Sequence, residues 1–205
     1  DLKFNKPMII STGGASFENI DTAVRTIRKF HNEVAILQCT ASYPAGFDQL
    51  NLNVIKRLRE IYPENVIGYS GHDNGIAMPV VAFTLGARVI EKHFTLNRAL
   101  KGTDHAFSLE PQGLQKMVRD LNRAAVALGD GVKKAYETEL APLRKMGKMI
   151  VASKNLNIGH LITEADLEFR SPSKGLSPEL YEEIIGKTIK SPVNQYEPIQ
   201  YVNLQ

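Results

Sequence analysis

The chain has 205 residues, 43% of them hydrophobic, so it can bury a real core in one large or two small domains. Its 25 basic and 22 acidic residues leave a net charge of only +3, which predicts no nucleic-acid partner. No segment approaches the roughly 20 apolar residues of a membrane span, so we expect no membrane partner. The single cysteine, Cys39, lies in an apolar run; it excludes a disulfide within the chain and favours the reducing cytoplasm.

The first 130 residues alternate apolar, β-prone runs with helical patterns. We predict strands over residues 7–12, 34–40, 66–70 and 87–95. We predict helices over residues 16–30, 52–62, 76–85 and 111–129. Strand–helix units with continuous apolar strands are typical of a parallel sheet, either open and doubly wound or closed into an eight-fold barrel. Both architectures place functional residues at the carboxyl ends of the strands.

The pattern changes after Gly129. Residues 133–148 are strongly charged, and we expect a helix followed by a linker there. Short β-prone runs at 149–153 and 167–170, turn residues and brief helical pieces predict a second, compact and mostly β domain. The predicted division is therefore a domain over 1–132, a linker over 133–148 and a domain over 149–205. At about 55 residues the second domain is marginal for independent stability, so docking onto a partner surface would help it.

Small hydroxyl and glycine residues follow the predicted strands, with Ser11 before a Gly-Gly pair and Ser70 before Gly71. Backbone N–H groups at such places lie near helix N-termini, where the helix dipole favours phosphate or carboxylate. The pattern therefore suits an anionic ligand. Any one of these residues taken alone is more often a turn former or a helix cap.

Two histidines end consecutive strands. His72 and His93 fall at the tips of neighbouring strands, and Glu91 stands two residues before the second histidine. Neutral imidazoles with a carboxylate and water nearby are a normal set for a divalent transition ion such as Mn²⁺. Two histidine ligands would make an open, catalytic type of site. For each histidine, a hydrogen-bonded structural role is the alternative.

Five motifs occur in a specific order and spacing: KPMIISTG, QCTASYP, GYSGHDNGIA, VIEKHFTL and KGTDHAFSLEP. Together they closely resemble the sialic acid synthase family, and the tail from about residue 149 resembles that family's antifreeze-like (SAF) domain. The resemblance implies an α/β fold in which the first part is the last four strand–helix units of a (β/α)8 TIM barrel, followed by a small, mostly β SAF domain. A whole barrel needs roughly 250 residues, so we expect its first half to lie outside this chain.

The resemblance also implies roles for individual residues of this sequence. His72 and His93 match metal ligands, for Mn²⁺ or alternatively Mg²⁺ or Co²⁺. Glu91 matches the carboxylate beside the reacting aldehyde, and Tyr43 is a second catalytic candidate on the sugar side.

The substrate-binding residues that the resemblance implies are Ser11 and Ser70 near phosphoenolpyruvate, Tyr43 and Asp104 near the sugar, and Arg170 in the tail. Arg170 would reach the N-acyl group of the sugar in the partner subunit's site, within a homodimer that exchanges SAF domains. Ala41 departs from the pattern, because some members carry Asn there and an alanine side chain cannot form a hydrogen bond.

The implied reaction condenses phosphoenolpyruvate and water with an N-acylated hexosamine, N-acetylmannosamine or a related deoxy-sugar, to give a nonulosonic acid and phosphate. Two alternatives stay open at this point. One is another phosphoenolpyruvate-condensing sugar-acid synthase. The other is a non-catalytic carbohydrate-binding or regulatory fragment, because the visible chain lacks half of the implied site and would be inactive alone.

Overall fold

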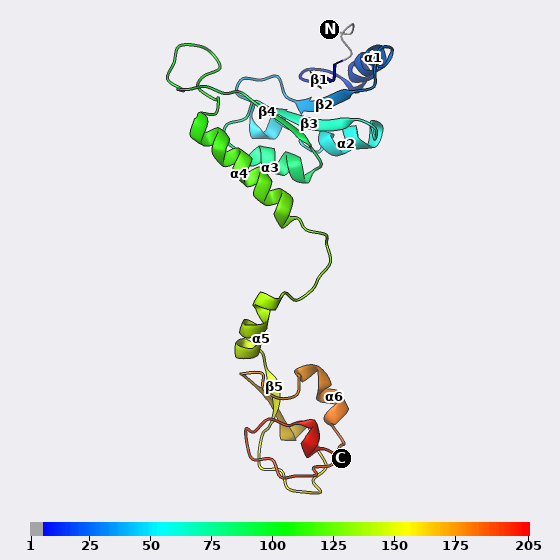
Figure 1. Ribbon diagram of the computed structural model, residues 1–205, viewed down its shortest axis with the longest axis vertical. Coiled ribbons are helices and arrows are strands. Elements are labelled where there is room, and N and C mark those ends of the chain that lie inside the picture. Colours follow the sequence, from blue (N-terminus) through cyan, green and yellow to red (C-terminus); the bar gives the residue numbers. More distant parts are fainter. Residues whose placement is uncertain (1–5) are drawn as a thin grey trace. The chain divides into compact units, whose positions relative to one another are not determined.

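A computed structural model describes residues 6–205, and residues 1–5, where the predicted first domain begins, lie outside the described part. The chain divides into two compact units, Asp1–Gly131 and Val132–Gln205. Each is described by itself (Figure 1). Within residues 6–205, no helix is both long and apolar enough to cross a membrane.

The first unit is built on a four-stranded parallel sheet, as predicted. Its strands are β1 (Met8–Ser11), β2 (Val34–Cys39), β3 (Val66–Gly71) and β4 (Val89–Lys92), and they pair in chain order. The predicted last strand ran to residue 95, whereas β4 ends at Lys92 and only an isolated parallel bridge, from Phe94 to Leu109, continues beyond it. His93 therefore lies just past the strand.

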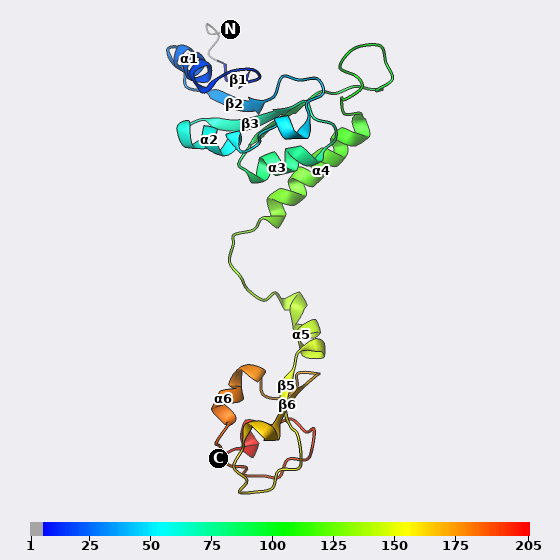
Figure 2. The ribbon, with the colours of Figure 1, turned by 180° about the vertical axis from the view of Figure 1, so that it is seen from behind.

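Four helices cover one face of this curled sheet (Figures 1 and 2). They are α1 (Phe17–Arg28), α2 (Val54–Ile61), α3 (Ala77–Thr84) and α4 (Pro111–Ala127), close to the predicted ranges. Ser16 caps α1 through its side chain, which accepts a hydrogen bond from the backbone of Asn19. Apolar residues of α1 to α3 form one buried core with the strands, which includes Val24, Ile36 and Leu58.

The two edge strands differ from the two central strands in burial. Alternate residues of β1 are exposed, and Ile9 keeps 57% of its surface accessible. In β2, by contrast, five of six residues are buried. The helix-side residues of β1 join the core, whereas its other face is left open.

The second unit has a small antiparallel pair, β5 (Met149–Ala152) with β6 (Leu167–Arg170), at the predicted β runs. Isolated bridges extend this pairing, and a separate apolar core includes Ile150, Leu156 and Ile199. One short helix, α6 (Tyr181–Ile184), accompanies it. Across the described chain, 3-10 turns lie at Phe47–Gln49, Glu137–Glu139, Glu164–Asp166, Pro178–Leu180 and Tyr201–Asn203.

The charged stretch at 133–148 contains a helix, α5 (Leu140–Met146), but in the reverse of the predicted order. The expectation of a helix followed by a linker is wrong there, since the irregular part comes first. Pro142 explains the position, because proline is tolerated in the first turn of a helix and not further inside. Backbone carbonyls of α5 accept hydrogen bonds from Ser171 and Ser173, which connect this helix to the β part of the second unit.

Candidate active site at the carboxyl edge of the sheet

Ser70 and Glu91 meet at the carboxyl edge of the parallel sheet. They are directly paired neighbours on β3 and β4, and the Ser70 hydroxyl donates a hydrogen bond of 2.6 Å to Glu91 Oε1. Side chains alternate along a strand, and the adjacent Tyr69 and Ile90 belong to the helix-side core. Ser70 and Glu91 therefore face the opposite, helix-free side of the sheet.

His72 and His93 lie beside each other at the same edge, as the sequence predicted. Their ring centroids are 5.1 Å apart. Tyr43, in the segment after β2, has its ring 4.3 Å from the His72 ring and 5.8 Å from the His93 ring. Phe107 closes the group, with its ring 5.0 Å from His93. Four aromatic rings from four separate segments thus converge next to the Ser70–Glu91 pair.

The orientation of His72 is fixed by the backbone of the neighbouring strand end. Its Nδ1 lies 2.8 Å from the carbonyl oxygen of Thr40. A carbonyl can only accept, so Nδ1 carries the proton in this bond and the Nε2 lone pair is left available. Metal-binding histidines commonly donate their second nitrogen to a backbone carbonyl in this way. His72 therefore fits a metal ligand.

His93 is less firmly held. Its Nδ1 is 3.7 Å from Asp104 Oδ2, which is beyond hydrogen-bonding distance. Asp104 is placed next to it by a turn in which Ser108 Oγ donates to the Asp104 carbonyl. Within residues 6–205 no three His, Cys, Asp or Glu residues converge as a metal-binding group. The described residues supply two adjacent imidazoles to this place, and the metal site stays a prediction.

The environment under the site is buried. Cys39, predicted to be core, is buried, and its Sγ lies 3.7 Å from His72 Nδ1. Burial raises the pKa of the Cys39 thiol, which keeps it protonated at neutral pH. Behind the strand ends, Lys92 pairs with Asp73, and burial lowers the pKa of Lys92 while Asp73 opposes that shift.

Two predicted residues do not join this cluster directly. Ser11 ends β1, and β2 separates it from β3 and Ser70. Arg170 belongs to the second unit, where its guanidinium lies 3.5 Å from the centre of the Tyr196 ring and its Nε donates to Glu168 at 2.9 Å. Their roles stay predictions.

The sequence reasoning missed several residues that shape the site. Phe107 lies within the motif KGTDHAFSLEP, but on a long irregular connection without a periodic pattern, so no role was predicted for it. Thr40 contributes through its carbonyl, which no sequence pattern reveals. Tyr69 and Lys92 could have been found, because period-two alternation along β3 and β4 puts them on the opposite face from Ser70 and Glu91.

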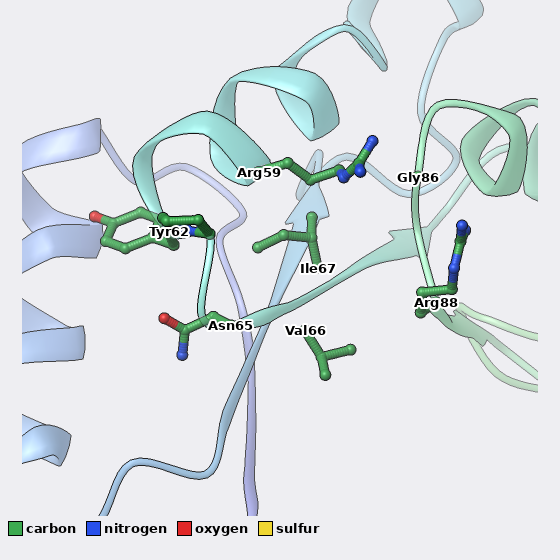
Figure 3. Close-up of a pocket in the computed structure, with 8 residues that line it drawn as sticks. Arg59, Tyr62, Asn65, Val66, Ile67, Gly86 and Arg88 are labelled. Carbon is green, nitrogen blue, oxygen red and sulfur yellow. The ribbon is translucent and has the colours of Figure 1, made fainter.

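A cavity of about 350 Å³ lies at the other end of the sheet. Arg59, Val66 and Arg88 are among its lining residues (Figure 3). Val66 begins β3 and Arg88 directly precedes β4, so the cavity is at the amino ends of these strands. Its lining includes none of the residues predicted for the site.

Comparison with known proteins gives two family matches. Residues 2–133 match the NeuB family, and residues 147–205 match the SAF domain.

Curated relatives include the N,N'-diacetyllegionaminic acid synthase of Campylobacter jejuni, 38% identical over 188 residues that cover 90% of this chain and 56% of that protein. The N-acetylneuraminate-9-phosphate synthase of Homo sapiens is 35% identical, over 96% of this chain and 55% of that protein. The chain thus spans about half the length of these relatives.

A solved structure of the spore coat polysaccharide biosynthesis protein SpsE from Bacillus subtilis is 31% identical, with a TM-score of 0.60 over all of this chain and 62% of that one. The α/β first unit and the small second unit thus have counterparts in a related solved protein. On the family matches and these identities, the chain belongs to the NeuB family and carries a SAF domain.

Proposed function

We propose that the chain is part of a nonulosonic acid synthase, which joins phosphoenolpyruvate to an N-acylated amino sugar. Relatives that bear on this proposal are named as synthases of N,N'-diacetyllegionaminic acid, N-acetylneuraminate 9-phosphate and pseudaminic acid. The observation that carries it is the convergence of Glu91, Ser70, His72, His93 and Tyr43 at one edge of the sheet. Family membership alone would not place reactive groups together.

In the proposed enzyme, the four-stranded sheet is the second half of an eight-stranded barrel. The edge strand β1 supports this proposal, because it exposes the apolar side chain of Ile9 on the face away from the helices. An exposed apolar edge strand is a liability that a closed barrel removes. Four further strands from outside residues 1–205 would cover that face and complete the site.

In the proposed reaction, C3 of phosphoenolpyruvate attacks the aldehyde carbon of the open-chain sugar. The oxygen of a water molecule bonds to C2, and phosphate leaves by cleavage of the C2–O bond. Of the two protons that the water gives up, one would reach the former aldehyde oxygen by way of Glu91 and the other would leave with phosphate. The Ser70 hydroxyl would keep the Glu91 carboxylate oriented. Tyr43, half-exposed beside both histidines, would contact the sugar.

His72 and His93 would hold the divalent cation, Mn²⁺ in the first place. When bound, such an ion supplies Lewis-acid polarisation of a carbonyl oxygen. The available Nε2 of His72 supports this assignment, as does the Asp104 carboxylate near His93. Ser11 and Asp104 would lie toward phosphoenolpyruvate and the sugar, respectively.

The proposed enzyme is a homodimer in which each SAF domain serves the partner's barrel. Arg170 would then bind the N-acyl carbonyl of the sugar. Its guanidinium is already ordered by Tyr196 and Glu168, which lowers the entropy lost on binding a ligand.

Phosphate release by the complete protein, with phosphoenolpyruvate and a panel of N-acyl hexosamines, tests the function. Turnover that needs both substrates supports it. Glu91→Gln should remove most of this activity, whereas Glu64→Gln on the opposite, amino-end side of the sheet should not. Sugar binding without turnover in the complete protein would instead favour the non-catalytic carbohydrate-binding alternative.

A further inference from the structure

A buried ion pair lies directly behind the two histidines. Lys92 Nζ is 3.1 Å from Asp73 Oδ1, and it also donates to the backbone carbonyl of Asp73. The two side chains are only 3% and 0% exposed. The Tyr69 hydroxyl donates to the same Asp73 oxygen at 2.6 Å. Together these three residues form a polar group within an otherwise apolar layer, which we term the buried clamp. All its side-chain contacts use Oδ1 of Asp73, whereas Oδ2 is buried without a hydrogen-bond partner among the described residues.

Each charged member of the buried clamp is the chain neighbour of one histidine. Asp73 follows His72, and Lys92 precedes His93. The last paired residues of β3 and β4 are Gly71 and Lys92. Both histidines therefore lie one residue beyond the end of the ladder of backbone hydrogen bonds that joins the two strands. The ion pair between Asp73 and Lys92 joins the two chain segments at the point where this ladder stops.

Gly71 supplies independent evidence that the buried clamp is a fitted arrangement. A Cβ atom added to Gly71 would lie 2.6 Å from Cε1 of Tyr69 and 2.8 Å from Oδ1 of Asp73. The absence of a side chain at this position thus leaves the space in which the tyrosine and the aspartate meet.

Stability alone explains such a group poorly. Removing two charges from water costs about as much as their attraction returns, and apolar residues of similar volume are often as stable or more stable. Unlike an apolar contact, a hydrogen-bonded ion pair fixes the distance and the relative orientation of its two side chains. We propose that Asp73, Lys92 and Tyr69 are positioning residues that set the separation of the His72 and His93 imidazoles.

This inference deepens the proposed metal site and rests on it for its link to function. The distance of 5.1 Å between the His72 and His93 ring centroids can be measured without a metal, and the buried clamp should set this distance whether or not a metal binds.

The test uses the complete protein with the double substitution Asp73→Asn and Lys92→Met. Both charges are removed together, so that no unpaired charge is left buried, and the asparagine oxygen can still accept from Tyr69. If the proteins with only Asp73→Asn or only Lys92→Met fail to fold, the double variant still provides the test. The matched control is Arg57→Met with Glu60→Gln, an exposed ion pair of 3.0 Å in the same unit.

Three measurements are made: the thermal unfolding midpoint without metal, the dissociation constant for Mn²⁺, and a crystal structure of the double variant. We expect the midpoint to stay close to wild type, the Mn²⁺ dissociation constant to rise about tenfold or more, and the two rings to move apart. The control pair should leave all three unchanged.

Unchanged Mn²⁺ affinity and an unchanged ring separation in the folded double variant would overturn the positioning role. If the wild-type protein binds no Mn²⁺, the proposed metal site fails. The ring separation in the crystal structure then still decides whether the buried clamp positions the histidines.

Discussion

Asp166 in the second unit offers a sharp test of how a small domain is stabilised. It is a fully buried carboxylate, and its Oδ2 accepts three hydrogen bonds of 2.8 Å, from the backbone and the hydroxyl of Thr163 and from Nε2 of His160. Lys154 Nζ lies 2.7 Å from the other oxygen. We predict that Asp166→Asn strongly destabilises this unit.

The magnitude follows from what an asparagine can keep. Its amide oxygen can still accept both bonds from Thr163, but the charge that binds His160 and Lys154 is lost. A hydrogen bond to a charged group is worth about 1.5–3 kcal/mol. The pair with Lys154 counts for about 0–1 kcal/mol, because the lysine side chain is 59% exposed. The expected loss is therefore about 1.5–4 kcal/mol. Each 1 kcal/mol moves the unfolding midpoint of a domain this small by about 4–8 °C, so the midpoint falls by about 6 °C or more.

The pH dependence has a definite sign. Burial alone would raise the pKa of Asp166, but the hydrogen bonds from Lys154, His160 and Thr163 outweigh it and hold that pKa well below its ordinary value of 3.8. The stabilisation is then present in full above pH 3.8, where the unfolded carboxyl is also ionised. It is lost as the pH falls below 3.8 toward the folded pKa. Asp166→Asn removes this component, so its difference from wild type should shrink in acid.

Scanning calorimetry between pH 7 and pH 3 measures both effects. Hydrogen exchange at neutral pH assigns the affected transition to residues of the second unit. Glu164→Gln is the control, because this carboxylate is exposed in the same turn and its loss should cost less than about 0.5 kcal/mol. An equal midpoint for wild type and Asp166→Asn at pH 7, or a difference that stays constant down to pH 3, would refute the reasoning.

Three further predictions concern the proposed enzyme. His72→Ala and His93→Ala should each abolish most Mn²⁺ binding by the complete protein, since one imidazole holds the ion too weakly; metal titration with wild-type affinity in both would contradict this. Residues 1–205 purified alone should release no phosphate from phosphoenolpyruvate and sugar, and robust turnover by a monomeric sample would argue against the half-barrel. Arg170→Ala should raise KM for the sugar and leave that for phosphoenolpyruvate nearly unchanged. Mixing this variant with inactive Glu91→Ala subunits should restore part of the activity, unless the SAF domain serves its own barrel.

The strands and helices of the first unit could be predicted because apolar residues carry the period of each element. The same pattern predicted that His72, His93, Glu91 and Ser70 lie at one edge, since the carboxyl ends of parallel strands meet at the same edge of a sheet. It could not specify which groups touch: the bond between Ser70 and Glu91 depends on the pairing register, which the sequence leaves open.

The long connection before α4 resisted prediction for a different reason. It has neither helical nor strand periodicity, yet it returns Asp104 and Phe107 to the histidines. Its course is set by tertiary contacts such as the bridge from Leu109 to Phe94. The proposed exchange of the second domain concerns two subunits, and no residue pattern within a single sequence specifies a contact between them.

The alternation of side chains along β3 and β4 links the chemistry of the site to the packing behind it. Ser70 and Glu91 face the open side of the sheet, while Tyr69 and Lys92 face the helices. Because neighbouring residues share one backbone, a shift on the helix side moves the reactive side by a similar distance. A displacement of about 1 Å can cost two orders of magnitude in rate. Substitutions behind the strand ends, with no contact to any substrate, should therefore change activity more than their effect on stability would suggest.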